Sequence, residues 1–253
     1  MILDSFKLDG KAALVTGARR GLGLGIAAGL AEAGADIFGV GSGGDASQCR
    51  AAVESAGREF AYLQADLAGA AAAGAVDACV ARFGRIDILV NNAGIIRRAD
   101  AVDFSEQDWD DVLELNLKTV FFMSQRAAKW MIGHGRGGKI INIASMLSYQ
   151  GGIRVASYTA SKSGLMGLTR ELANEWAKHG INVNAIAPGY MATDNTEALR
   201  NDPVRNGEIL GRIPAGRWGG KEDLAGAAVF LASGASEYVH GFTLAVDGGW
   251  LSR

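Results

Sequence analysis

The chain of 253 residues is poor in several features that mark particular classes of protein. It has two cysteines, Cys49 and Cys79, which lack the C-x-x-C spacing of a zinc or redox site and are predicted to be buried thiols in a reducing compartment. No run approaches the roughly 18 uncharged apolar residues of a membrane-spanning helix, and the first residues, MILDSFKLDGK, lack the apolar stretch of a signal peptide. We therefore expect a cytoplasmic protein with no membrane partner.

Charge of one sign is not concentrated anywhere in the chain. Lysine and arginine number 25 against 27 acidic residues, which gives a net charge of -2 without any block of like charge. Such a surface does not favour nucleic acid as a partner. The three histidines are scattered, so we expect no metal site. A small molecule is the expected ligand.

Seven apolar segments of strand length alternate with longer segments that have helical spacing. Strands that are apolar on both faces are typical of a parallel sheet covered by helices on both sides. The sequence therefore predicts an α/β fold with a doubly wound sheet, in one domain over residues 1–253. The predicted strands are residues 12–17, 36–40, 59–64, 86–92, 139–145, 181–188 and 242–249.

Proline is scarce, and its three positions all fall in the last third of the chain. Pro188 ends the sixth predicted strand, and Pro203 and Pro214 lie between the sixth and the seventh, where the alternation of strands and helices is least regular. Long irregular connections in compact folds are usually functional or disordered. We therefore predict a flexible flap over a binding site at residues 190–219.

The first predicted strand runs directly into TGARRGLG, residues 16–23, and then into a helical segment. This first strand-to-helix turn is where backbone N–H groups meet a pyrophosphate in doubly wound folds. The spacing of Gly17, Gly21 and Gly23 differs from G-x-G-x-x-G, so the position of the motif carries the interpretation. The turn predicts dinucleotide binding.

The acidic residue that normally binds the adenosine ribose is missing after the second predicted strand, where Gly41 and Ser42 stand. Arg19 and Arg20 in the glycine turn either meet a phosphate or are solvated surface charges. NADP is therefore not excluded as an alternative to NAD.

Tyr158 and Lys162 stand four residues apart in a helical segment, which places them on one helix face. A neighbouring ammonium favours the phenolate, so the pair predicts a general acid/base at Tyr158, although a chance pairing would look the same. Ser145 ends the fifth predicted strand, where the ligand crevice of such folds lies. Asn116 is a polar residue inside an apolar helical stretch, where an amide needs buried partners.

The order TGARRGLG, NNAG (91–94), Asn116, Ser145, YTASK and PGYMAT (188–193) resembles the short-chain dehydrogenase/reductase family over nearly the whole chain. The resemblance implies a Rossmann-like domain with a seven-stranded sheet, and usually a homotetramer. It implies that Tyr158 exchanges a proton with the substrate oxygen, that Lys162 lowers the pKa of Tyr158 and binds the nicotinamide ribose, and that Ser145 hydrogen-bonds the reacting oxygen. Asn116 would hold a water through which Lys162 reaches solvent.

The resemblance also implies which residues bind the cofactor. Asp66 and Leu67 would meet the adenine, although Asp66 is equally suited to cap a helix. The full set expected around the cofactor is Gly17, Arg19, Arg20, Gly21, Leu22, Gly23, Ser42, Asp66, Leu67, Asn92, Ala93, Gly94, Tyr158, Lys162, Pro188, Gly189, Tyr190 and Thr193.

Four further stretches, INIASMLSYQGGIRVASYTASKSG, NEWAKHGINVNAIAPGYMAT, RIPAGRWG and AVDGGWL, resemble the sugar-acid branch of the family, which degrades pectin- or uronate-derived keto sugar acids and usually prefers NAD. A sugar-acid carboxylate suits the planar fork of arginine. Arg98 and Arg154 are candidates for this contact and Gln150 for the hydroxyls, and each of these three could instead be a surface or subunit-contact group. Ser145 and Tyr158 complete the expected substrate contacts.

Three other functions stay open from the sequence. Two are enzymatic, a dehydrogenase of gluconate at carbon 5 and a reductase of 3-oxoacyl groups on a carrier protein. The second would call for a basic surface, which the balanced charge does not indicate. The third is a dinucleotide-sensing protein without catalysis, against which the complete set Asn116, Ser145, Tyr158 and Lys162 argues.

Overall fold

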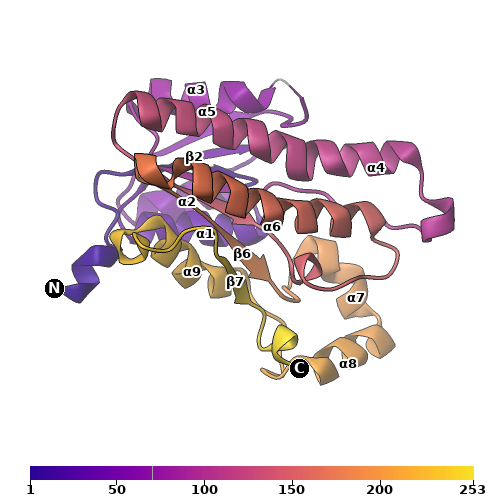
Figure 1. Cartoon of the computed structure of the whole chain (residues 1–253). Helices are drawn as coiled ribbons and strands as arrows, with labels where there is room; N and C mark the ends of the chain where they lie inside the picture. The colour runs from indigo at the N-terminus through magenta and orange to yellow at the C-terminus, as the bar shows by residue number, and fades with distance from the viewer. Residues whose placement is uncertain (70) are drawn as a thin grey trace.

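The computed structural model describes residues 1–69 and 71–253, and its centre is one seven-stranded parallel sheet with the order β3-β2-β1-β4-β5-β6-β7 (Figure 1). The order reverses after β1, which is the arrangement of a doubly wound fold. The predicted fold class is therefore confirmed. The strands are β1 (Ala12–Thr16), β2 (Asp36–Gly41), β3 (Phe60–Gln64), β4 (Ile88–Asn91), β5 (Gly138–Ile143), β6 (Ile181–Pro188) and β7 (Thr243–Val246).

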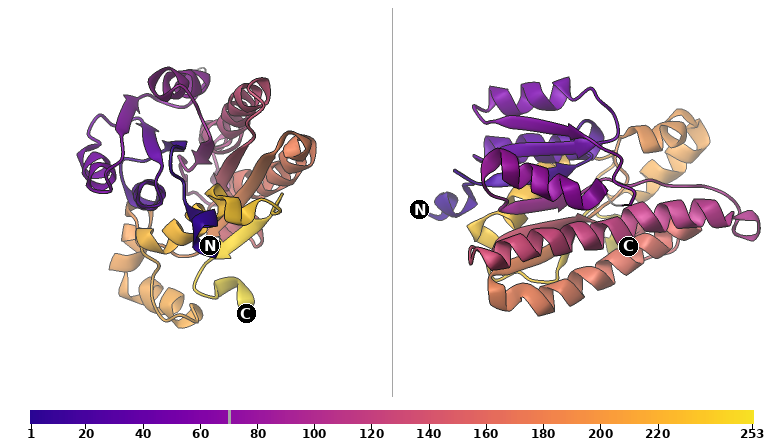
Figure 2. Two further views of the ribbon diagram at one scale, coloured as in Figure 1. Left: turned by 90° about the vertical axis from the view of Figure 1, so that its left-hand side faces the viewer. Right: turned by 90° about the horizontal axis from the view of Figure 1, so that it is seen from above.

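Helices cover both faces of the sheet, which explains why its central strands are apolar on both sides (Figure 2). Helices α1, α2 and α9 pack on one face, and α3, α5 and α6 pack on the other. The α-helices are α1 (Gly21–Glu32), α2 (Ser47–Ser55), α3 (Ala71–Phe83), α4 (Glu106–Leu113), α5 (Thr119–Gly133), α6 (Ala156–Trp176), α7 (Glu197–Asn201), α8 (Pro203–Arg212) and α9 (Ala225–Ala232).

Short helical turns occupy several of the connections. A π-helical turn, Glu114–Lys118, joins α4 to α5. The 3-10 helices are Ile2–Phe6, Ala101–Asp103, Met146–Ser148, Ala177–His179, Asp194–Thr196, Lys221–Leu224, Gly234–Ser236 and Trp250–Ser252.

The connection between β6 and β7 is more regular than the sequence indicated. Residues 190–219 contain α7 and α8, whereas we expected an irregular chain. The reason is local: Asp202 accepts hydrogen bonds from the N–H groups of Val204 and Arg205, and Pro203 occupies the first helical position. Asp-Pro at these positions is a helix-start signal that outweighs the scarcity of apolar periodicity. Flexibility of this segment stays a prediction.

The prediction that the two cysteines are buried thiols is confirmed, because Cys49 and Cys79 are both fully buried and unpaired. Burial raises the pKa of each thiol to about 12, which makes them inert at neutral pH. Within residues 1–69 and 71–253 no helix is long and apolar enough to cross a membrane.

Candidate active site

A cleft with a volume of about 320 Å³ lies at the carboxyl ends of β1, β2, β4 and β5. Parallel strands present their ligand crevice at this edge of the sheet. The predicted residues that line the cleft are Gly17, Arg19, Arg20, Gly21, Leu22, Ser42, Asp66, Leu67, Asn92, Ala93, Gly94, Tyr158, Lys162 and Thr193. The structure therefore brings together residues from most of the length of the chain.

The backbone of the glycine turn adopts conformations and close contacts that only glycine allows. Gly17 and Gly21 have φ values of +67° and +54°, in the left-handed region that side chains rarely adopt. A Cβ on Gly23 would lie 2.2 Å from the carbonyl oxygen of Gly17, so only glycine allows this close approach. Helix α1 begins at Gly21 without a side-chain cap, which leaves backbone N–H groups directed at the cleft.

A hydrogen-bonded frame joins the glycine turn to the NNAG motif. The Thr16 hydroxyl accepts hydrogen bonds from the N–H groups of Asn92 and Ala93, both at 2.8 Å. The side-chain amide of Asn92 donates to the Thr16 carbonyl at 2.8 Å. These bonds fix the floor of the cleft between β1 and β4.

The two arginines of the glycine turn lie on different sides of the cleft. Arg19 lies against Gly43, where an added Cβ would approach its Nε to 2.7 Å, and the Tyr62 hydroxyl donates to the Gly43 carbonyl at 2.6 Å. Arg20 lies on the other side of the turn and forms an ion pair with Asp194. Asp66 accepts a hydrogen bond from the N–H of Ala68, so it caps its own turn while also lining the cleft.

Tyr158 and Lys162 lie together at the inner end of the cleft, as their spacing predicts. The Lys162 Nζ lies 5.6 Å from the centre of the Tyr158 ring. It donates a 2.6 Å hydrogen bond to the carbonyl of Ile143, at the end of β5. Burial lowers the pKa of the Lys162 ammonium to about 8.

The electrostatics around Tyr158 differ from the expectation. Burial raises the pKa of the phenol above its ordinary value, while a hydrogen bond with Ser145 and the positive charge of Arg98 act in the opposite direction. We expected Lys162 to lower this pKa. In the structure the lowering comes from Ser145 and Arg98, because the lysine directs its Nζ to the Ile143 carbonyl and lies over the ring face.

Asn116 is completely buried in the π-helical turn between α4 and α5. Its Oδ1 accepts from the N–H of Ile95 at 2.9 Å, and its Nδ2 donates to the Ile95 carbonyl at 2.8 Å. Asn116 does not line the cleft itself, but it fixes Ile95, which does. A π-helical turn often marks a functional site, because it re-aims one side chain.

The three substrate candidates outside the catalytic set have different surroundings. Arg98 acts electrostatically on Tyr158, and its Nη2 donates to the carbonyl of Asn195, a cleft residue. Gln150 accepts a 3.4 Å hydrogen bond from Arg212 on α8. Arg154 pairs with Asp100 at 3.1 Å and does not line the cleft.

Several predicted residues lie beside the cleft without lining it. Ser145 is connected to the site by its effect on Tyr158. Gly189 packs closely on Asp247, and a Cβ added to Gly189 would lie 2.6 Å from the Cα of Asp247. Tyr190 packs against Trp218 and Trp250. Gly23 and Pro188 also stand outside the lining. The cleft residues that the sequence did not indicate are Gly41, Gly43, Ala65, Ile95, Leu115, Ile143, Asp194 and Asn195.

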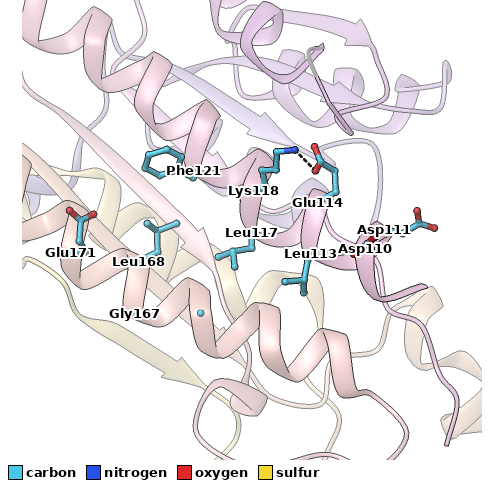
Figure 3. Close-up of a pocket in the computed structure, with 11 residues that line it drawn as sticks. Asp110, Asp111, Leu113, Glu114, Leu117, Lys118, Phe121, Gly167, Leu168 and Glu171 are labelled. Carbon is cyan, nitrogen blue, oxygen red and sulfur yellow. Dashed lines mark hydrogen bonds and ion pairs between the residues drawn. The ribbon is translucent and has the colours of Figure 1, made fainter. Parts of the chain in front are cut away.

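A larger groove, of about 920 Å³, lies elsewhere, between the outer faces of α4, α5 and α6 (Figure 3). Leu113, Leu117, Phe121 and Leu168 give it apolar walls, and two helix glycines, Gly164 and Gly167, line its α6 side. Carboxylates and one lysine surround it. This groove combines no nucleophile with a general base, so the smaller cleft is the candidate active site.

Comparison with known proteins shows the family of the chain. The family described as enoyl-(acyl carrier protein) reductase matches residues 17–251. The chain is 64% identical, over the whole length of both chains, to the 2-dehydro-3-deoxy-D-gluconate 5-dehydrogenase of Dickeya dadantii (strain 3937).

Two crystal structures are similar over nearly the full chain. One is a provisionally assigned 2-deoxy-D-gluconate 3-dehydrogenase from Agrobacterium tumefaciens with bound NADP, which is 57% identical with a TM-score of 0.93 and covers 98% of this chain and 99% of its own. The other is a gluconate 5-dehydrogenase from Burkholderia cenocepacia J2315 in complex with NADP and tartrate, 43% identical with a TM-score of 0.93 over both whole chains. The chain therefore belongs to the short-chain dehydrogenase/reductase family and is an oxidoreductase.

Proposed function

We propose that the protein interconverts a hydroxyl and a keto group on a sugar acid, and that its substrate is 2-dehydro-3-deoxy-D-gluconate, oxidised at carbon 5 in uronate or pectin breakdown. The observation that carries this proposal is the convergence of Tyr158, Ser145 and Arg98 beside the cleft. A phenol and a hydroxyl suit the reacting oxygen, and a guanidinium suits a carboxylate. The substrate itself is suggested by the full-length similarity to the Dickeya dadantii enzyme.

The cleft fits a nicotinamide dinucleotide. The uncapped start of α1 and the glycine turn suit the pyrophosphate, and Ser42, Asp66 and Leu67 lie toward the adenosine end. Pro188, Gly189, Tyr190 and Thr193 are proposed for the nicotinamide end. When bound, the dinucleotide supplies the hydride acceptor for oxidation or the donor for reduction.

The protein's own groups handle the proton and the developing charge. Tyr158 removes the proton from the substrate hydroxyl in oxidation and returns it in reduction. Ser145, which acts to lower the pKa of the phenol, is proposed to stabilise charge on the same substrate oxygen. Lys162 is held by the Ile143 carbonyl. We propose that it supports the ribose and that Asn116 holds a water through which the lysine reaches solvent.

Arg98 is the proposed carboxylate ligand. Its positive charge lowers the pKa of the Tyr158 phenol, and its Nη2 donates to the carbonyl of Asn195, a cleft residue, so we propose that it binds the substrate carboxylate on this side of the cleft. Gln150 is proposed for a substrate hydroxyl.

Both NAD and NADP are proposed as cofactors. No acidic side chain stands at Gly41 or Ser42 to repel a 2′-phosphate, and Arg19 lies against Gly43 beside them. The similar Agrobacterium tumefaciens protein has bound NADP. The preference for NAD that the sequence suggested is retained as the proposal for the physiological cofactor.

Gluconate is the second candidate substrate, at the same carbon. It is favoured by the similarity to the gluconate 5-dehydrogenase of Burkholderia cenocepacia, whose complex contains tartrate, a polyhydroxy dicarboxylate. Both candidates present a carboxylate and a secondary alcohol, so the same residues would serve either one.

Self-association is proposed through the apolar groove between α4, α5 and α6 (Figure 3). Helix faces that are apolar and rich in glycine are suited to the close approach of another pair of helices, and a two-fold axis would pair each groove with its copy. This supplies one interface of the proposed homotetramer. Two buried, unpaired thiols suit the reducing cytoplasm, where we place the protein.

The test is a panel of keto sugar acids, with acetoacetyl thioesters as the contrasting class, each assayed with NADH and NADPH. We expect the fastest turnover with a 5-keto sugar acid. Tyr158→Phe should reduce turnover by at least about 10³-fold, while dinucleotide binding, followed by fluorescence titration, stays within about twofold. Full activity of the variant, or preference for thioesters, would refute the proposal.

A further inference from the structure

Arg154 has an unusual backbone conformation. Its φ of +65° is the only positive value at a residue other than glycine within residues 1–69 and 71–253. A large side chain in the left-handed region is strained, and such strain persists only where the surroundings hold it. The residue stands immediately before Val155, the buried N-cap of α6, and four residues before Tyr158.

Two contacts hold Arg154 in this conformation, and both come from the arm that follows β4, residues 92–105. The N–H of Ala99 donates to the Arg154 carbonyl at 3.2 Å. The Arg154 Nε pairs with the Asp100 carboxylate at 3.1 Å. Asp100 precedes the short helix Ala101–Asp103 but does not cap it with its side chain, so its described partner is Arg154.

The same arm carries Arg98, two residues before Asp100. Arg98 has no acidic partner within the described part of the chain. Its Nη2 donates a 3.3 Å hydrogen bond to the carbonyl of Asn195. A single hydrogen bond of this length does not fix a long side chain on a connection. Asn116 fixes the arm at Ile95, and Arg97 pairs with Asp108 and Asp111 on α4, so both of these anchors precede Arg98. The contacts of Ala99 and Asp100 with Arg154 add an attachment toward α6 on the other side of Arg98.

We propose that Arg154 and Asp100 form a clasp that ties the arm to the start of α6 and so fixes Arg98 opposite Tyr158. Arg154 is then a positioning residue and not a ligand of the substrate carboxylate. The inference rests on the proposed function, because it takes the reaction at Tyr158 and the role of Arg98 as given.

The experiment compares Asp100→Ala, Arg154→Ala, Arg154→Gly and the exchange variant Asp100→Arg/Arg154→Asp. Aspartate tolerates the left-handed conformation better than arginine, so the exchange restores the ion pair without added strain. Arg154→Gly removes the side chain and relieves the strain, which guards against a folding defect. Arg126→Gln, which breaks a similarly exposed ion pair with Asp77 between α5 and α3, is the control.

Two readouts separate the clasp from the proposed function. The first is kcat and KM for the keto sugar acid. Each single variant should lose about tenfold in kcat with a smaller change in KM, because a small displacement of the Arg98 guanidinium strongly lowers the rate. The second needs no substrate. It is the ultraviolet titration of the Tyr158 phenolate, taken as the difference between each variant and the same variant with Tyr158→Phe, because the chain has five tyrosines.

The single variants should raise the pKa of Tyr158, because Arg98 lowers it in the native protein and would act from farther away. Lys162 is the other cation near the phenol, and it belongs to α6 itself, so it should be unaffected. The exchange variant should restore both readouts, and Arg126→Gln should change neither. A KM increase alone, without rescue by the exchange, would make Arg154 a direct ligand and overturn the clasp. Single variants that match the control in the titration would overturn it independently of any substrate.

Discussion

At the scale of single residues, the most costly side chain in the site is Lys162, which is buried without an acidic partner. Its burial lowers the pKa to about 8 from an ordinary value of 10.5, so the unfolded chain retains this proton over a pH range in which the folded chain has lost it. The stability of the native chain should therefore rise, through this group, as the pH increases from about 8 to 10.5, and this contribution should be constant below pH 8. The ammonium is tolerated because the Ile143 carbonyl accepts its hydrogen bond.

Lys162→Met keeps the apolar stem and removes the titration. The native chain gains stability through Lys162 between pH 7 and pH 10, and the variant does not. We therefore expect the Tm of the variant minus the Tm of the native protein to fall by several degrees over this range, because each kcal/mol of unfolding free energy corresponds to about 2–4 °C in a chain of this size. Thermal unfolding followed by circular dichroism at four pH values measures it. Lys178→Met, at an exposed site just after α6, is the matched control for loss of a lysine. A Tm difference for Lys162→Met that does not change with pH would contradict the proposed origin of the low pKa.

At the scale of elements, the turn between β1 and α1 separates two consecutive arginines. Arg19 lies against Gly43 at the end of β2, while Arg20 turns to Asp194 in the connection after β6. Only Arg19 therefore lies on the side where we propose that the adenosine ribose binds. Arg19→Ala should raise KM for NADPH by about tenfold and change KM for NADH by less than twofold, because only NADPH carries the 2′-phosphate. Arg20→Ala should alter both constants alike, and a selective loss of NADPH in that variant would contradict the assignment.

At the scale of helices, strands and turns, some features could be predicted from the sequence and others could not. The seven strands were predictable because each contains several apolar residues within a short segment, and the glycine turn because it directly follows the first of them. The spacing of Tyr158 and Lys162 placed both on one helix face. The π-helical turn at Asn116, the ion pair of Arg20 and the contact of Arg154 with Asp100 were not predictable, because each depends on a partner from a distant segment.

At the scale of the whole molecule, the apolar groove between α4, α5 and α6 is a surface that the chain itself leaves uncovered (Figure 3). Gly167 lines it, and a Cβ there would meet nothing within 4 Å. Gly167→Gln would thus place a side chain in the groove without disturbing the chain's own core, and it should favour the helix by about 0.5–1 kcal/mol. If a second copy occupies the groove, the mass of the Gly167→Gln variant in sedimentation velocity should fall to half or less of the native mass, whereas Gly167→Ala, with its smaller side chain, should assemble more nearly as the native protein does.

Gly74→Gln, at an open glycine on α3, should leave the mass unchanged. An unchanged mass for Gly167→Gln would mean that the protein assembles through other surfaces and that the groove faces solvent.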